Sequence, residues 1–123
     1  MTKILVIDDD EKTRVFLQTV LEHEGYNVFV AKDGEDGLQS FYQSSPNLII
    51  TNIVMPNKDG IEVIMEVRLP YPKLPIIAMA EDHRSMSASL ALDIAMSLGA
   101  TAKLLKPFTH QELNDAIRLV LVL

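Results

Sequence analysis

Short runs of isoleucine, valine and leucine return five times along this chain, and each is followed by a segment with helical spacing. The first run, Lys3–Ile7, stops at Asp8, as expected of a strand that is buried on both faces. Strands that alternate with helices need right-handed crossovers, which give a parallel sheet covered on both sides. The pattern therefore predicts an α/β fold with a five-stranded, parallel, doubly wound (βα)5 sheet. The other four predicted strands are Asn27–Ala31, Leu48–Thr51, Pro75–Ala80 and Thr101–Leu105.

Capping residues and glycines mark the helices between these strands. Asp10 can cap a first helix over about residues 11–24, and Gly25 suits its C-terminal end. A second helix is expected from near Gly34, a third from Ile61 to Arg68, a fourth from about Ser87 to Leu98, and a last one capped by Thr109. The apolar side of the first helix is predicted to consist of Val15, Phe16, Val20 and Leu21.

The composition limits the classes of protein to be considered. The 123 residues, 48% of them hydrophobic and 23% charged, suit one soluble domain over residues 1–123, and no apolar run approaches the roughly 18 residues that span a bilayer. The start of the chain has no signal-peptide pattern and cysteine is absent, so a cytoplasmic location without thiol chemistry is expected. A net charge of −6 argues against direct binding of nucleic acid.

The residues best suited to binding or catalysis stand at the ends of the predicted strands. In open parallel sheets the functional crevice lies at the carboxyl ends of the strands. The adjacent carboxylates of Asp8 and Asp9 are hard oxygen donors that suit Mg²⁺. Lys106 could place an ammonium group over the same crevice, although a lone lysine there is more often a solvated loop residue. One acid could instead merely cap the first helix, but Asp10 already suits that role, which favours a site role for the pair.

Three motifs stand in a particular order and spacing: Ile4–Asp10, Asn47–Gly60 and Lys106–Phe108. With them the chain resembles, over nearly its whole length, the receiver domain of response regulators in two-component signalling. The resemblance implies a flavodoxin-like receiver fold, a signalling role rather than an enzymatic one, and a histidine kinase or another signalling protein as partner.

The resemblance also implies roles for individual residues. Asp8 and Asp9 would hold Mg²⁺ together with the side chain at position 52 and the backbone carbonyl of Val54. Position 52 would be the phosphoacceptor, and Lys106 would contact the phosphoryl group and precede a cis proline. All of these roles are expectations carried over from the family.

Three residues depart from the family pattern. Asn52 stands where the family has its phosphoaccepting aspartate, and a carboxamide is too poor a nucleophile to form the acyl phosphate. Ala80 replaces a serine or threonine whose hydroxyl bonds the phosphoryl group, and Lys103 replaces the switch aromatic residue. The sequence therefore predicts a phosphorylation-independent interaction domain, whose Mg²⁺ binding is weak because one carboxylate of the site is now a neutral amide.

Other interpretations compete with this one. An ordinary phosphoaccepting receiver could carry an engineered Asn52, but three departures favour a naturally degenerate receiver. A haloacid-dehalogenase-type phosphatase would use Asp8 as nucleophile and Asp10 as general acid, but Lys12 stands where a small or β-branched residue is expected, and a later acidic pair is missing. A flavin-binding module is disfavoured because the acidic segment Asp8–Glu11 would repel a phosphate.

The predicted last helix has more apolar residues than it needs to cover the sheet. Its covering stripe is Leu113, Ile117, Val120 and Leu121, and the additional apolar residues are Leu119, Val122 and Leu123. We therefore expect a weak homodimer through the face formed by the fourth helix, the fifth strand and the fifth helix, which would include Lys103. A frayed end is the alternative. The sequence leaves open whether the chain is a stand-alone receiver or part of a larger regulator.

Overall fold

The computed structural model describes residues 1–122, and in this part of the chain five parallel strands form one sheet. The strands are β1 (Lys3–Ile7), β2 (Asn27–Ala31), β3 (Leu48–Asn52), β4 (Ile76–Ala80) and β5 (Ala102–Leu105). Their order across the sheet is β2-β1-β3-β4-β5. The predicted α/β class and the flavodoxin-like order are therefore confirmed.

Each helix begins at a side chain that caps it. The helices are α1 (Glu11–His23), α2 (Gly34–Ser44), α3 (Gly60–Arg68), α4 (Ala88–Ser97) and α5 (His110–Leu121). The side chain before each first residue accepts a hydrogen bond from the backbone N–H three positions on, which satisfies a donor that has no partner within the helix. These capping residues are Asp10, Asp33, Asp59, Ser87 and Thr109.

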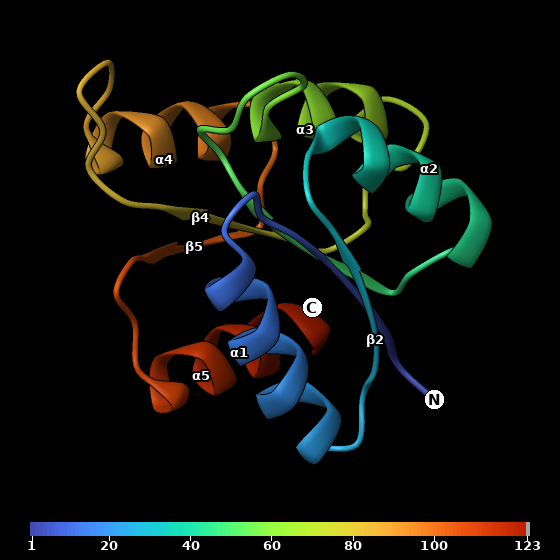
Figure 1. Cartoon of the computed structure of the whole chain (residues 1–123). Coiled ribbons are helices and arrows are strands. Elements are labelled where there is room, and N and C mark those ends of the chain that lie inside the picture. Colours follow the sequence, from blue (N-terminus) through green and yellow to red (C-terminus); the bar gives the residue numbers. More distant parts are fainter. Residues whose placement is uncertain (123) are drawn as a thin grey trace.

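The helices cover the sheet on both faces (Figure 1). Helices α1 and α5 pack on one face, where the fully buried Leu17 and Leu21 meet Ile4 and Val6 of β1. Helices α2, α3 and α4 pack on the other face, around Leu5, Ile7 and their neighbours. The strands β1, β3 and β4 lie inside the sheet and are almost wholly buried. Their carboxyl ends are thereby held in fixed positions at one edge.

The predicted apolar side of α1 was partly wrong. Val15 and Phe16 are 57% and 41% exposed, whereas Leu17 and Leu21 are completely buried. The helix carries apolar residues on more than one side, so periodicity alone does not say which side meets the sheet.

Two strand starts were also predicted one residue early. β4 begins at Ile76, because Pro75 has no N–H to donate to a neighbouring strand, and β5 begins at Ala102.

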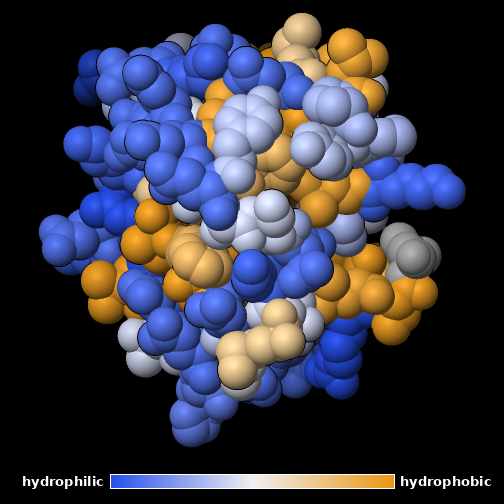
Figure 2. Space-filling model, turned by 90° about the vertical axis from the view of Figure 1, so that its right-hand side faces the viewer, coloured by the Kyte–Doolittle hydropathy of each residue, from blue (hydrophilic) through white to orange (hydrophobic). Residues whose placement is uncertain are grey.

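The surface is mainly polar, with apolar patches between the charged side chains. Figure 2 faces the side on which the N-terminus lies in Figure 1, and shows these patches in orange among blue hydrophilic residues. Among the described residues, Leu119 is 56% and Val122 is 80% exposed, while Leu123 lies outside them. None of the helices in this part of the chain has the length and apolar character needed to cross a membrane.

Candidate functional site

The crevice at the carboxyl ends of the strands is centred on Asp8, which follows β1 directly. Asp8 is fully buried, and both of its carboxylate oxygens accept hydrogen bonds. The backbone N–H of Asp10 donates to Oδ1 at 2.9 Å, and Nζ of Lys106 donates to Oδ2 at 2.6 Å. The buried acid is therefore held at once by the start of α1 and by the end of β5.

Lys106 reaches this acid from the far side of the crevice. Its backbone N–H donates to the carbonyl of Ala80 at 2.8 Å, which ties the residue after β5 to the end of β4. The Lys106 side chain is only 9% exposed, and the carboxylate of Glu81 lies 3.9 Å from its Nζ. The peptide bond from Lys106 to Pro107 is cis. The ammonium group is thus directed into the crevice rather than into solvent.

Burial decides the protonation behaviour of Asp8. Removal from water raises the pKa of its carboxyl above the ordinary value of 3.8, because the charged form loses hydration. The hydrogen bonds from Lys106 and from the Asp10 backbone lower the pKa, as does the positive charge of Lys106, but these effects do not fully offset the burial. Lys106 therefore favours the charged form of Asp8 and opposes the effect of burial.

Asn52 ends β3 and faces the same crevice. It is 5% exposed, and its Nδ2 donates to the carbonyl of Val54 at 3.0 Å and to Oδ1 of Asp9 at 3.4 Å. Its own Oδ1 is buried and has no hydrogen-bond partner in the structure. The amide thus presents its two donors to oxygens on two different loops, while its acceptor stays unused.

Close packing fixes the backbone around Asn52. Gly60, the first residue of α3, donates its N–H to the carbonyl of Ile53 at 2.9 Å. A Cβ on Gly60 would lie 2.3 Å from the carbonyl oxygen of Asn52 and 2.8 Å from Cα of Ile53. Because these are backbone atoms with little freedom to move, only glycine lets α3 start this close to the end of β3.

The remaining predicted site residues take different positions. Ala80 is 1% exposed, so its methyl group lies buried at the end of β4. Lys103 lies apart from the crevice. Its side chain is 55% exposed and forms an ion pair with Asp93 of α4 at 3.8 Å. The crevice thus brings together Asp8, Asp9, Asn52 and Lys106 but not Lys103.

Two contacts of the crevice were missed by sequence reasoning. Arg14, one turn into α1, donates from Nη1 to the carbonyl oxygen of Asp8 at 2.8 Å. Glu81 follows β4 and approaches Lys106 as described above. Arg14 lies four residues after the capping residue Asp10, and this spacing places a helical side chain one turn along the same side of the helix. A contact of Arg14 with the residues before the helix could therefore have been predicted from the sequence.

The oxygen atoms of the crevice are of the kind that holds Mg²⁺, but the set is incomplete. Carboxylates, a backbone carbonyl and an amide oxygen are all suitable donors, and the partnerless Oδ1 of Asn52 is a free acceptor. However, Asp8 is paired with Lys106, and within residues 1–122 there is no cluster of three acidic, histidine or cysteine side chains suited to a metal. The crevice therefore offers oxygen donors of the kind that Mg²⁺ prefers, with one of its carboxylates already paired to a lysine.

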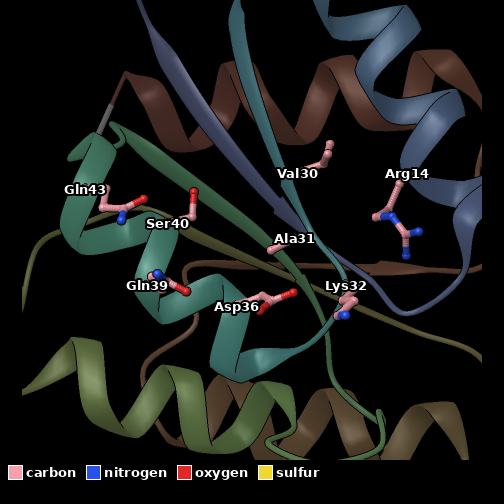
Figure 3. Close-up of a pocket in the computed structure, with 8 residues that line it drawn as sticks. All are labelled: Arg14, Val30, Ala31, Lys32, Asp36, Gln39, Ser40 and Gln43. Carbon is pink, nitrogen blue, oxygen red and sulfur yellow. The ribbon is translucent and has the colours of Figure 1, made fainter.

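A separate hollow lies beside the crevice, between α1 and α2 over the end of β2 (Figure 3). It has a volume of about 410 Å³, and its walls carry Arg14 and Lys32 as well as Asp36 and uncharged amides. Figure 3 shows Arg14 entering from α1, and Asp36 and the glutamines from α2. The described residues that line this hollow form no buried charged pair like that of Asp8 and Lys106, so we place the candidate site in the crevice.

Comparisons with known proteins agree on one family. The sequence profile of the response regulator receiver domain matches residues 4–118. The alkaline phosphatase synthesis transcriptional regulatory protein PhoP of Bacillus subtilis is 35% identical over 119 residues, which are 97% of this chain and 48% of PhoP. The chain therefore spans about half the length of this curated relative.

Solved structures of similar chains give the same result. A putative response regulator from Chloroflexus aurantiacus has a TM-score of 0.87 at 31% identity, with 99% of this chain and 98% of that chain covered. A response regulator receiver domain protein from Clostridium thermocellum has a TM-score of 0.84 at 31% identity, with 98% and 94% covered. The chemotaxis protein CheY4 of Vibrio cholerae has a TM-score of 0.85 at 28% identity, with 98% of both chains covered.

Proposed function

The chain belongs to the response regulator receiver domain family, and from this premise we propose that it is a phosphorylation-independent interaction domain of a two-component pathway. Receiver domains are signalling modules that change partners when an aspartate at the end of the third strand is phosphorylated. In this chain that position holds Asn52. The amide at Asn52 is the single observation that carries the proposal.

The chemistry of the amide supports a loss of phosphorylation. Phosphoryl uptake needs a carboxylate oxygen as nucleophile, and the Asn52 side chain has a carbonyl oxygen and an NH₂ group instead. That NH₂ group is also engaged with Asp9 and Val54. Ala80 offers no hydroxyl to a phosphoryl group. Lys106, which would contact a phosphoryl group, is paired with Asp8 at 2.6 Å.

Receiver domains generally bind Mg²⁺ at the phosphorylation site, and we propose that this chain binds it weakly. Asp8, Asp9, the carbonyl of Val54 and, once its amide has turned, Oδ1 of Asn52 would hold the ion. The neutral amide provides less attraction than a carboxylate. Lys106 further reduces the negative charge that Asp8 can offer.

We further propose a weak homodimer, and a histidine kinase or another signalling protein as partner. The dimer face would combine α4, β5 and α5, where Leu90 is 51%, Leu105 is 59% and Leu119 is 56% exposed. Lys103 and Asp93 form an exposed ion pair between α4 and β5 in the same region. Apolar side chains beside exposed charges suit a contact between protein chains.

The remaining parts of the proposal concern the chain as a whole. We propose that residues 1–123 form one receiver domain, that it acts in the cytoplasm, and that it does not bind nucleic acid directly. The net charge of −6 supports the last point, because binding to phosphates requires a basic face. Transcriptional regulation is named for PhoP as a whole protein, about half of which this chain matches.

Treatment with a small phosphodonor tests the proposed loss of phosphorylation. The chain and its Asn52→Asp variant would be incubated with acetyl phosphate and Mg²⁺ and examined by intact mass and peptide mapping. We expect one phosphate on Asn52→Asp at residue 52 and none on the peptide of the unchanged chain that contains Asn52. A phosphate localised to Asn52 itself would contradict the proposal.

Beryllofluoride provides a second test that does not require covalent chemistry. It mimics a phosphoryl group on a carboxylate, so backbone NMR shifts around position 52 should change in Asn52→Asp and stay the same in the chain that carries Asn52. Equal shifts in both proteins would show that the crevice still accepts a phosphoryl mimic, and the interaction domain would then not be independent of phosphorylation.

A further inference from the structure

The two N–H groups of the Asn52 amide connect parts of the crevice that are separate in the sequence. One reaches the carbonyl of Val54, in the loop between β3 and α3, at 3.0 Å. The other reaches Oδ1 of Asp9, at the start of α1, at 3.4 Å. The amide nitrogen is therefore positioned between an anionic oxygen and a carbonyl oxygen, both of which are good ligands for a divalent cation.

An aspartate in the same position would reverse this interaction. It would bring a second carboxylate towards Asp9 and the Val54 carbonyl, with no hydrogen between the oxygens. Two carboxylates placed this close to each other repel and raise each other's pKa unless a cation lies between them. With aspartate, the crevice thus needs a cation to bring these oxygens together, whereas with asparagine the side chain supplies the positive ends of two N–H bonds.

We propose that the Asn52 amide nitrogen takes the place of the divalent cation, joining Asp9 to the Val54 carbonyl and closing the crevice without metal. Asn52 is in this sense a positioning residue. The proposal concerns how the crevice is held together, and it applies whether or not the chain exchanges phosphate with a donor.

The partnerless Oδ1 of Asn52 supports this assignment. Rotating the amide by half a turn would direct Oδ1 towards the Val54 carbonyl and the Asp9 carboxylate, where it would face two acceptors. The observed orientation instead leaves Oδ1 buried without a donor, which carries a desolvation penalty. In return, the amide donates one hydrogen bond to the Val54 carbonyl at 3.0 Å and one to the charged Asp9 carboxylate at 3.4 Å.

The consequence is a difference in how stability depends on Mg²⁺. In the unchanged chain a cation would have to displace the amide nitrogen, so added Mg²⁺ should change stability little. In Asn52→Asp the N–H groups are gone and an additional carboxylate faces Asp9. That variant should be less stable without metal and should recover when Mg²⁺ enters.

Urea unfolding in EDTA and in millimolar MgCl₂ tests the proposal. In EDTA we expect Asn52→Asp to have a folded-to-unfolded ratio about tenfold lower than the unchanged chain, since it loses two hydrogen bonds and gains a like-charge contact. Mg²⁺ should restore most of this loss in Asn52→Asp and should barely change the stability of the unchanged chain. Asn27→Asp makes the same chemical change on an exposed residue at the start of β2, at the opposite end of the sheet from the crevice, and serves as the matched control that should show neither effect.

Two results would overturn the proposal. One is that Mg²⁺ stabilises the unchanged chain as strongly as it stabilises Asn52→Asp, because the cation would then not compete with the amide. The other is that Asn52→Asp is as stable as the unchanged chain in EDTA. NMR adds a local measurement, since the backbone amide signals of Asp9 and Val54 should move with Mg²⁺ in Asn52→Asp and stay nearly fixed in the unchanged chain. Both outcomes are independent of phosphate uptake, so they are distinguishable from failure of the proposed function.

Discussion

Replacing Lys106 by methionine should destabilise the protein strongly at neutral pH, because it leaves the carboxylate of Asp8 buried without its counter-charge. The Asp8 side chain is 1% exposed and that of Lys106 is 9% exposed, with 2.6 Å between Oδ2 and Nζ. Removing one partner of a buried ion pair costs roughly 3–5 kcal/mol. Asp8 keeps the hydrogen bond from the Asp10 backbone and can take up a proton, so we expect about 3 kcal/mol.

The loss should depend on pH in a defined direction. Burial already raises the pKa of Asp8 above 3.8, and removal of the ammonium group raises it further. Between 3.8 and the raised pKa, the folded variant holds a proton that the unfolded chain has released, so the free energy of unfolding falls as pH rises. The difference in the free energy of unfolding between Lys106→Met and the unchanged chain should thus be small below pH 3.8 and reach its full size above the raised pKa.

Urea unfolding from pH 3 to pH 8 measures this difference, with EDTA present to exclude metal. The double variant Asp8→Asn with Lys106→Met removes the buried charge as well, and it should recover most of the loss, giving a coupling of about 2 kcal/mol. Additive effects of the two substitutions, or a loss from Lys106→Met that is the same at pH 3.5 and pH 7, would refute the argument that an uncompensated buried charge is the cause.

Three further predictions follow from other contacts. Gly60→Ala should lower stability by about 2 kcal/mol in urea unfolding, because its methyl group would meet backbone atoms at 2.3 and 2.8 Å. The three atoms nearest to a methyl group on Gly37 all belong to the side chain of Ile7, which can move more easily than backbone, so Gly37→Ala should cost less. Asp33→Ala removes the cap of α2 and should cost about 1 kcal/mol at pH 7. The loss of stability caused by Asp33→Ala should shrink as pH falls below 3.8. The hydrogen bond from the Asp36 backbone lowers the pKa of Asp33, and the stabilisation it gives is lost as the carboxyl takes up a proton. A loss at pH 2 as large as that at pH 7 would contradict this. Sedimentation over a wide concentration range should show weak self-association that Leu119→Glu abolishes, and a strict monomer throughout would contradict the dimer face.

Local patterns in the sequence were sufficient for the order of the elements. Strands with continuous apolar runs, such as Lys3–Ile7, and caps such as Asp10 and Thr109 act over a few residues, so their signals can be read without knowing the fold. The rule that parallel strands end at one edge then brought Asp8, Asn52 and Lys106 to the same crevice. The general place of the candidate site was thus available from sequence.

The side of α1 that meets the sheet was decided only by tertiary packing. Val15, Phe16 and Leu17 are all apolar, and only the position of β1 and α5 shows that Leu17 is buried while the other two are exposed. The ion pair between Asp8 and Lys106 likewise joins residues 98 positions apart, so its distance and burial depend on the whole sheet.

The sequence by itself determined which chemical groups stand at the strand ends, including an amide at position 52 in place of a carboxylate. Only the tertiary structure decided how that amide is turned, with its N–H groups towards Asp9 and Val54 and its oxygen buried without a partner. The physical reason is that a side chain's composition is local, whereas its hydrogen bonds depend on which loops the folded sheet brings within about 3 Å of it.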